Sequence, residues 1–457
     1  MNSSTGLDRR VAVLGGGLAG LRAAYELERR GFVATVFEAG AQVGGRTHGE
    51  WCGGHWMDGA WPVLGSRDRS LARWARELGL GDSLLPLRPL QTTLRRGLES
   101  IPVDGLSLRG AARIPGPTIW ERPKLLRSSR LMARYAKLLD PMFPERAADL
   151  DYRSIRDHVV LYFGRGNLEF WLAPEVQGHY GDSVEELSRV ALLLQMQSMG
   201  MGERRPGSPG LPRRPLFELA QAASERLDIL RGTAVTRIDE EPAGGFRVEA
   251  VGDSGEQIER FFDAVVVALG PEQAKSVSST LLTPAERDFF QDVRLRPVAT
   301  LSVAIEGVEG GLPSEVRMPR RGGSAISSLV IEPGQPNGRV PEGRSQIVAL
   351  ARDAFADRWR EMADDVVSKN LMSSLELAMP GIGDRILTTR LGRGTAPFFA
   401  VGSYRRLAVF QKVQRDRRAL GRRLYWAGDY LSGPGFESAS LSGVRAAHAL
   451  AGDFDRA

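Results

Sequence analysis

Three glycines near the start of the chain, Gly15, Gly17 and Gly20, have the spacing of a loop that binds a dinucleotide. In such a loop Gly15 allows a tight turn and Gly17 lets the backbone approach a pyrophosphate. Gly20 lets the following helix pack closely on the preceding strand. The first N–H groups of that helix, from Leu18 and Ala19, then face the pyrophosphate. The spacing therefore predicts that this loop binds nucleotide phosphates.

An acidic residue, Glu38, closes the second expected strand, eighteen residues after Gly20. Its carboxylate, with Ala39 beside it, is placed to accept hydrogen bonds from a ribose diol. A glycine motif alone is weak evidence. Here it follows an apolar run at residues 11–14 and opens a helical pattern. With strand, helix and acid in register, the segment predicts the adenosine end of a dinucleotide site.

Two later segments could complete such a site. Gly44-Gly45-Arg46 forms a second glycine-rich loop, and a strand at 423–427 ends in Gly428-Asp429 before a helix that contains Ser438 and Ala439. An acid at the end of a strand can hold a ribityl hydroxyl. The helix N-terminus can face the edge of a flavin that becomes negative on reduction. The alternative is an ordinary strand–turn–helix with Gly and Asp as turn residues.

Side chains for the reacting centre are harder to choose from the sequence. The early loop offers His55 and Trp61, with Gly59 and Ala60 between them, and the last unit offers Tyr404. We take these three side chains as catalytic candidates, although core packing is the commoner role of an aromatic residue. A further group from the helical part could line a substrate cavity or simply fill a core: His179, Tyr180 and the methionines at 196–201.

A basic segment at 127–137 places Arg or Lys every three to four residues beside leucines. This pattern is compatible with a helix that lies on a membrane surface, which would give peripheral contact without a membrane span. The commoner explanation is the solvated face of a core helix.

The elements that position these candidates come from separate parts of the chain. Residues 9–65 indicate a β-α-β unit, residues 86–200 are mainly helical, and an apolar strand at 262–269 suits the centre of a parallel sheet. Alternating strands follow, and a last unit begins near 385. We therefore predict an α/β protein whose nucleotide-binding domain comprises 1–85, 205–290 and 385–457, with a substrate domain comprising 86–204 and 291–384.

Composition limits the class of protein. The 457 residues exceed what one core usually supports, and the net charge of +6 is modest. Only five of the 61 basic residues are lysines, and the chain has a single cysteine, Cys52. These features argue against a disulfide framework, a cysteine metal site and nucleic-acid binding. The polar N-terminus lacks the apolar region of a secretory signal, so we expect a cytoplasmic protein without a metal.

The chain resembles the flavin amine oxidase superfamily, which includes monoamine oxidases, protoporphyrinogen oxidases and phytoene-type desaturases. The segments that carry this resemblance are the glycine loop at 15–20 with Glu38, Gly44-Gly45-Arg46, the strand at 262–270, and Trp426-Ala-Gly-Asp429 with Ser438 and Ala439. The resemblance implies FAD rather than NAD. It also implies a discontinuous Rossmann-type (GR2-like) FAD-binding domain with an inserted α+β substrate-binding domain. The resemblance implies that FAD is contacted by Gly15, Gly17, Gly20, Glu38, Gly45, Arg46, Asp429 and Ala439, with Val235 beside the adenine. We expect the cofactor site to include also Leu18, Ala19, Ala39, Gly44, Gly59, Ala60, Gly428 and Ser438.

The same resemblance helps to choose a branch. Many amine oxidases carry a lysine on a substrate-domain strand, but residues 297–305 contain none, and residues 396–405 lack the cysteine that attaches FAD covalently in monoamine oxidases. We therefore expect noncovalent FAD and two-electron oxidation or desaturation of a small lipophilic or cyclic substrate. O2 or another molecule would accept the electrons, and the chain would be a monomer or homodimer. An amine or amino-acid oxidase that forms an imine and H2O2 is the alternative, followed by a non-catalytic flavin- or NAD(P)-binding protein.

Overall fold

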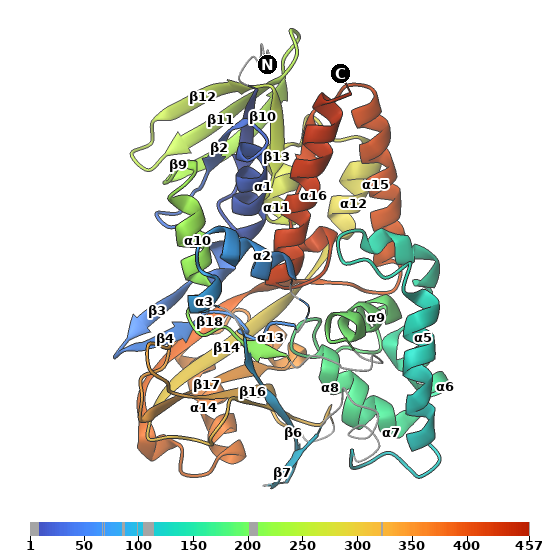
Figure 1. Ribbon diagram of the computed structural model, residues 1–457, viewed down its shortest axis with the longest axis vertical. Coiled ribbons are helices and arrows are strands. Elements are labelled where there is room, and N and C mark those ends of the chain that lie inside the picture. Colours follow the sequence, from blue (N-terminus) through green and yellow to red (C-terminus); the bar gives the residue numbers. More distant parts are fainter. Residues whose placement is uncertain are drawn as a thin grey trace.

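A five-stranded parallel sheet forms the centre of the upper half of the protein (Figure 1). The computed structural model describes residues 9–65, 67, 69–84, 87–97, 99–103, 114–200, 209–320 and 323–456. The strand order is β19-β13-β1-β2-β9, so strands that are distant in the sequence lie side by side. The strands are β1 (Arg10–Leu14), β2 (Val33–Phe37), β9 (Asp228–Leu230), β13 (Ala264–Val267) and β19 (Leu424–Trp426). The predicted α/β class with a Rossmann-type sheet is confirmed.

Both faces of this sheet are covered, because side chains alternate along each strand. In β1, Val11 and Val13 enter one core and Ala12 and Leu14 enter the other. The first core lies under α1 (Leu18–Glu28), α2 (Arg69–Glu77), α10 (Phe217–Ser224) and α16 (Phe436–Phe454). The second lies under α11 (Pro271–Val277), α12 (Pro284–Asp292), α15 (Ser403–Ala419) and the small sheet of β10 (Thr233–Glu240), β11 (Phe246–Gly252) and β12 (Gln257–Phe262).

A seven-stranded mixed sheet forms the lower left part of the molecule (Figure 1). Its order is β18-β14-β17-β16-β15-β6-β7, and α13 (Asp353–Arg358) and α14 (Asp364–Ala378) pack on it. The strands are β6 (Gln91–Arg96), β7 (Glu99–Pro102), β14 (Arg294–Glu306), β15 (Ser314–Arg317), β16 (Ile326–Pro333), β17 (Arg344–Ala351) and β18 (Ile386–Phe398).

The strand β18 departs from the predicted organisation. It pairs antiparallel with β14 along nearly its whole length, so residues 386–398 belong to the substrate-side sheet rather than to the nucleotide-binding part. Its sequence mixes threonine, arginine and glycine without regular apolar alternation, and this pattern conceals the strand.

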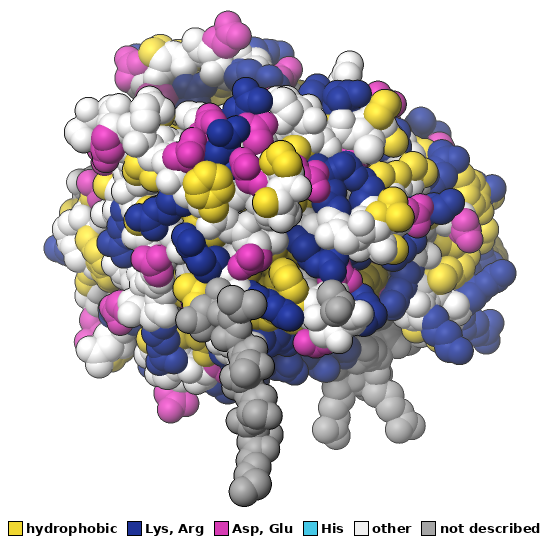
Figure 2. Space-filling view, turned by 90° about the horizontal axis from the view of Figure 1, so that it is seen from above, with side chains coloured by type: hydrophobic (Ala, Val, Ile, Leu, Met, Phe, Trp, Pro, Cys, Tyr) yellow, Lys and Arg dark blue, Asp and Glu magenta, His cyan; other side chains and the backbone are white. Residues whose placement is uncertain are grey.

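Helices form the lower right part of the molecule. They are α5 (Arg127–Tyr135), α6 (Ile155–Tyr162), α7 (Arg165–Asn167), α8 (Ala173–Val176) and α9 (Arg189–Ser198), and they share one apolar core. Met201, one of the predicted cavity residues, lies outside the described residues. Every helix in the described part of the chain is too short or too polar to cross a bilayer. On the face seen in Figure 2, basic and acidic side chains are interspersed.

Candidate active site

The first glycine loop joins β1 to α1, and its geometry requires glycine. Gly15 has φ of +105°, in the left-handed region. A Cβ on Gly20 would lie 1.9 Å from the carbonyl oxygen of Gly15, whereas a Cβ on Gly17 would meet no atom within 4 Å. The loop is therefore closed on its inner side and open at Gly17, beside the unpaired N–H groups that begin α1. This open cradle fits the approach of a pyrophosphate.

Glu38 lies at the end of β2 and closes the rim of this loop. Its two carboxylate oxygens accept hydrogen bonds of 2.7 Å each, one from the N–H of Gly16 and one from the N–H of Gly40. The N–H of Thr233, two residues before Val235 on β10, donates to the carbonyl of Glu38. The chain thus gathers Glu38, Ala39 and Val235 at one rim, where the sequence expects the adenosine.

The second glycine segment meets the first directly. The N–H of Gly44 donates to the carbonyl of Gly16 at 2.8 Å, and Gly44 has φ of +110°. Two residues later, an Arg46 guanidinium nitrogen lies 2.6 Å from a carboxylate oxygen of Asp429, which follows β19. Three segments that are up to 400 residues apart therefore form one continuous surface.

The last helix, α16, completes this surface. The N–H of Gly428 donates to the hydroxyl of Ser442 at 2.8 Å, which fixes the strand end to the helix. A Cβ on Gly443 would lie 2.2 Å from the carbonyl oxygen of Ala19, so α16 packs against α1 almost backbone to backbone. Ser438 and Ala439 lie in the first turn of α16. Nearby, the buried Ser432 hydroxyl has no hydrogen-bond partner among the described residues, which leaves a polar group available to a cofactor.

A narrow cavity opens beside these segments. Arg46, Gly59 and Ala60, all expected at the cofactor, line it. Phe436, the first residue of α16, lines it too, although the sequence did not single out this residue. Asp58 and Arg339 form another part of the wall.

Asp58 belongs to a buried ionic network that sequence reasoning missed. Its carboxylate accepts a hydrogen bond of 2.8 Å from Arg339, and Arg339 also donates to Glu332 on β16 at 2.8 Å. Glu332 in turn pairs with Arg88. Burial raises the pKa of Asp58 to about 6, against the opposing effect of Arg339. The network therefore places a carboxyl group near its titration point in the cavity wall.

His55, the expected base, lies at the opposite end of the same strand, β4 (His55–Asp58). It is buried opposite Cys52 on β3 (Gly49–Cys52), and it is absent from the cavity wall around Asp58. Three residues of strand span about 10 Å, which separates the imidazole from that wall. Burial lowers the pKa of His55. The structure therefore favours Asp58, not His55, as the titratable group of β4 at the cavity.

The two aromatic candidates are packing residues in this structure. Trp61 is 8% exposed and packs with Val63 and Leu90 in a small apolar cluster. Tyr404 is fully buried in the core of the helical part, where its backbone N–H donates to Asp151. An aromatic residue at a loop or helix end gives no sequence signal that separates these two roles.

Tyr180 does reach the cofactor side. A Cβ on Gly433, in the turn between Asp429 and α16, would lie 3.1 Å from the Tyr180 hydroxyl. Burial raises the pKa of Tyr180 well above its usual range, so the phenol stays protonated. His179 contacts the carbonyl of Val63 through Nε2 at 3.1 Å, and its own carbonyl accepts a hydrogen bond from Arg296.

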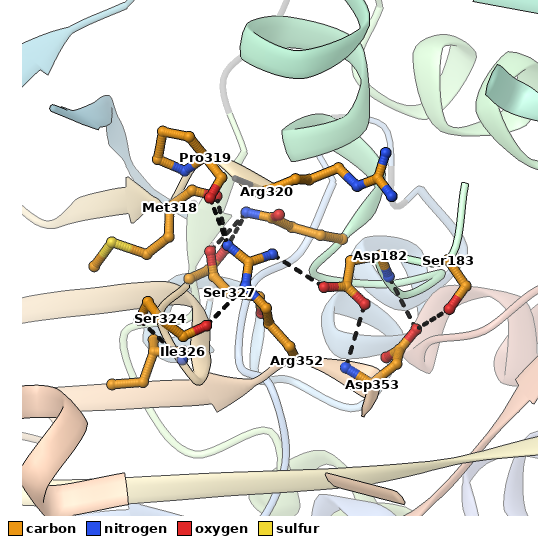
Figure 3. Close-up of polar contacts among 12 residues, drawn as sticks. Asp182, Ser183, Met318, Pro319, Arg320, Ser324, Ile326, Ser327, Arg352 and Asp353 are labelled. Atoms are coloured by element: carbon orange, nitrogen blue, oxygen red, sulfur yellow. Dashed lines mark hydrogen bonds and ion pairs between the residues drawn. The ribbon is translucent and has the colours of Figure 1, made fainter. Parts of the chain in front are cut away.

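A polar joint of hydrogen bonds and ion pairs holds the segment at 179–183 to the seven-stranded sheet (Figure 3). Arg352 donates to Asp182 at 3.0 Å and to the carbonyls of Met318, Pro319 and Ser324. Asp353 accepts from the N–H of Asp182 at 2.9 Å and from Arg296 at 2.8 Å. The joint fixes where the helical part presents Tyr180.

Strand β14 passes directly beneath the Asp58–Gly59 segment. The Ser302 hydroxyl donates to the carbonyl of Asp58 at 2.9 Å, and the Thr300 hydroxyl lies 3.5 Å from the carbonyl of Gly59. The hydroxyl groups of Thr300 and Ser302 therefore lie in residues 297–305 of β14, the stretch in which we noted the absence of a lysine.

Comparisons with known proteins agree with this arrangement. The sequence profile of the family described as flavin containing amine oxidoreductase matches residues 18–451. A Mycobacterium tuberculosis protein with the provisional name flavin-containing monoamine oxidase is 26% identical over 298 residues, which is 60% of each chain. Nicotine dehydrogenase of Pseudomonas putida is 33% identical over 162 residues, 34% of this chain and 31% of that protein. The chain thus matches about three fifths of the length of the first of these relatives.

Solved structures share the fold. Putrescine oxidase superposes with a TM-score of 0.74 at 18% identity, over 99% of this chain and all of that one. A provisionally named protoporphyrinogen oxidase from Exiguobacterium superposes with a TM-score of 0.72 at 20% identity, over 99% of each chain. At these identities the likeness establishes the architecture alone.

Proposed function

Since the chain belongs to the flavin-containing amine oxidoreductase family and is an FAD-dependent oxidoreductase, we propose that it oxidises or desaturates a small lipophilic or cyclic organic substrate, as protoporphyrinogen oxidases and desaturases do. When bound, FAD supplies the acceptor for the two electrons and the hydride. O2 or another molecule accepts the electrons afterwards. The chain's own residues bind the cofactor, orient the substrate and exclude water.

The observation that carries this choice is the wall beneath Asp58 and Gly59. Here β14 presents the hydroxyls of Thr300 and Ser302, which are already engaged with carbonyl groups. An amine base on this strand is therefore lacking. Behind this wall, Trp61, Val298, Val348 and Leu350 belong to a buried apolar cluster, which adds no charged group to it.

The two glycine loops, Glu38, Asp429 and α16 determine how we expect FAD to be attached. We propose that the Gly17 cradle and the α1 N-terminus hold the pyrophosphate, Glu38 holds the ribose, and the Arg46–Asp429 pair and α16 hold the ribityl and pyrimidine end. Binding would be noncovalent, because residues 396–405 contain no cysteine. Acid precipitation should release all of the flavin into the supernatant, whereas flavin that stays with the precipitated protein would contradict this proposal.

The test of the substrate class is flavin bleaching without oxygen. The holoenzyme is mixed anaerobically with a porphyrinogen, a polyene, primary and secondary amines, and amino acids, and the loss of absorbance near 450 nm is followed. We expect bleaching by an uncharged cyclic or polyene substrate. Rapid reduction by simple amines would overturn this preference.

An amine substrate is the second candidate, and one observation favours it. Asp58 places a carboxyl group in the cavity wall, where a cationic amine would find a partner. The names of the relatives, monoamine oxidase and nicotine dehydrogenase, point the same way. If this candidate is right, Asp58→Asn should raise KM for an amine at least tenfold and leave KM for an uncharged substrate unchanged.

A further inference from the structure

The outer edge of the helical part exposes a group of large apolar side chains that we call the aromatic rim: Ile119, Trp120, Val160, Leu161 and Tyr162. Trp120 is 82% exposed, Ile119 75% and Leu161 59%. A tryptophan this open to water is uncommon, because its ring gains most when it is buried. Single exposed apolar residues need no explanation, but a cluster of them marks an interaction surface.

Hydrogen bonds hold the two halves of the aromatic rim together. Glu121, next to Trp120, accepts from the N–H of Gly166 at 3.0 Å, and its carbonyl accepts from Asn167 at 3.0 Å. Arg127 at the start of α5 donates to the carbonyl of Tyr162 at the end of α6 at 3.1 Å. The turn at 118–121 and the end of α6 therefore belong to one edge of the molecule.

The charge around the aromatic rim is strongly positive. Residues 118–137 contain six basic residues and one acidic residue, a net of +5, while the entire chain carries +6. The single acid, Glu121, is engaged with backbone N–H groups of its own neighbourhood. This basic segment lies beside Trp120, the most exposed tryptophan among the described residues.

The helix α5 shows how this charge is presented. Leu131, Met132 and Tyr135 pack on the core of the helical part, while Arg130 and Arg134 of α5, and Lys137 just beyond its end, are exposed. The apolar face of α5 is therefore occupied within the protein, as expected for a core helix, and the helix has no free apolar face to insert. Its basic face and the neighbouring aromatic rim point outward instead.

We propose that this edge docks on an anionic lipid bilayer. The aromatic rim enters the interface, where tryptophan and tyrosine rings are favoured, and the basic face of α5 lies on the negative headgroups. The contact is peripheral. It does not depend on the identity of the substrate, so it can fail or hold independently of the proposed oxidation.

The experiment is co-sedimentation of the FAD-loaded protein with vesicles. We expect binding to vesicles of phosphatidylcholine with phosphatidylglycerol, little binding to phosphatidylcholine alone, and release at high salt. Equal binding to both vesicles, or to neither, would overturn the proposal. Selective binding to a soluble polyanion such as heparin, with no vesicle binding, would also overturn it, in favour of an acidic macromolecule.

Matched variants locate the contact. Trp120→Ser should weaken vesicle binding by roughly tenfold or more, whereas Leu420→Ser, which alters an 88% exposed residue at the end of α15, should not. Arg130→Gln with Lys137→Gln should weaken it by about thirtyfold. The control pair, Arg260→Gln with Arg415→Gln, removes two exposed charges elsewhere. Equal losses in test and control variants would contradict a defined docking edge.

Flavin content and circular dichroism of each variant complete the test. All four variants change only exposed side chains outside the cofactor segments. We therefore expect the FAD absorbance and the melting temperature of each variant to match those of the parent protein. A variant that loses vesicle binding together with FAD would show misfolding. In that case Trp120→Tyr, which keeps an interfacial ring, should restore binding if the docking proposal holds.

Discussion

Two buried arginines occupy similar charge environments in different regions of the molecule. Arg339 lies between Asp58 and Glu332, and Arg317 lies between Glu175 and Glu315. Both arginines are almost fully buried. The surroundings differ: the Arg339 network lines the cavity beside Arg46 and Gly59, whereas the Arg317 network lines a separate narrow cavity.

This difference shows how the role of a buried ion cluster can be inferred. The Arg317 network joins α8 of the helical part to β15 of the sheet, beside Phe170 and Trp171, and it is a structural joint. The Arg339 network performs a similar mechanical task but also faces the expected cofactor. A buried charge pair is weak evidence of function in itself, and its position relative to the cavity decides the interpretation.

The largest effect is expected at the structural joint. Arg317→Leu leaves Glu175 and Glu315 buried without their cation and should lower the free energy of unfolding by about 3–5 kcal/mol. Chemical denaturation of the holoenzyme measures this change. The folded fraction should keep its normal flavin spectrum and FAD content, and a loss below about 1 kcal/mol would show that water reaches the carboxylates.

A pH-dependent effect is expected at the cavity. Because burial raises the pKa of Asp58 to about 6, from an ordinary value of 3.8, the native state binds this proton more tightly than the unfolded chain does. The stability that this protonation contributes is therefore present at low pH and is lost as the pH rises to about 6. We expect the stability of the parent protein relative to Asp58→Asn to fall by about 3 kcal/mol between about pH 4 and pH 7.

The matched control for this prediction is Glu175→Gln. Burial also raises the pKa of Glu175, so the stability difference should follow pH in the same direction. The flavin absorbance maxima of the parent protein should in addition shift with pH, and only Asp58→Asn should abolish this shift. An equal loss of the shift in Glu175→Gln would remove the distinction between the two networks.

A moderate effect is expected for Glu38→Ala, which removes two hydrogen bonds to backbone N–H groups at the rim of the first glycine loop. The variant also lacks the carboxylate that would accept from a ribose hydroxyl, and one charge-assisted hydrogen bond contributes about 1.5–3 kcal/mol, so FAD should bind on the order of tenfold to a hundredfold more weakly. Fluorescence titration of the apoprotein with FAD measures this. Full retention of FAD after dialysis would count against the role of Glu38.

The smallest effect is expected for Arg46→Ala. The arginine is 49% exposed, so its pair with Asp429 contributes only about 1 kcal/mol to stability. We expect a melting temperature within a few degrees of the parent and a modest loss of FAD affinity. Arg393→Ala, which removes a pair between β18 and the exposed Asp364 at the start of α14, should leave FAD affinity unchanged.

The cofactor segments could be predicted because their signals are local. A glycine that must adopt positive φ, such as Gly15, and an acid that closes a strand, such as Glu38, are visible within a few residues of sequence. The discontinuous sheet could also be expected, since β13 is an apolar run that is closed by Gly-Pro.

The cavity wall could not be predicted, for a physical reason. Asp58 and Arg339 are 281 residues apart, and Arg339 comes from a loop rich in glycine and proline without a periodic pattern. Only the folded chain brings them together. The sequence also could not show which end of β4, His55 or Asp58, lies in this cavity wall, because the direction of the strand decides it.

The contact between Gly443 and Ala19 has a consequence for the newly made protein. Helices α1 and α16 meet backbone to backbone, and Asp429 and the start of α16 complete the surface that the first glycine loop begins. Asp429 and the start of α16 must therefore have left the ribosome before FAD can be held by both the first and the last of these segments. FAD binding then has to wait for this helix, and chains that end before α16 should be recognisable in a cell extract by their lack of flavin colour.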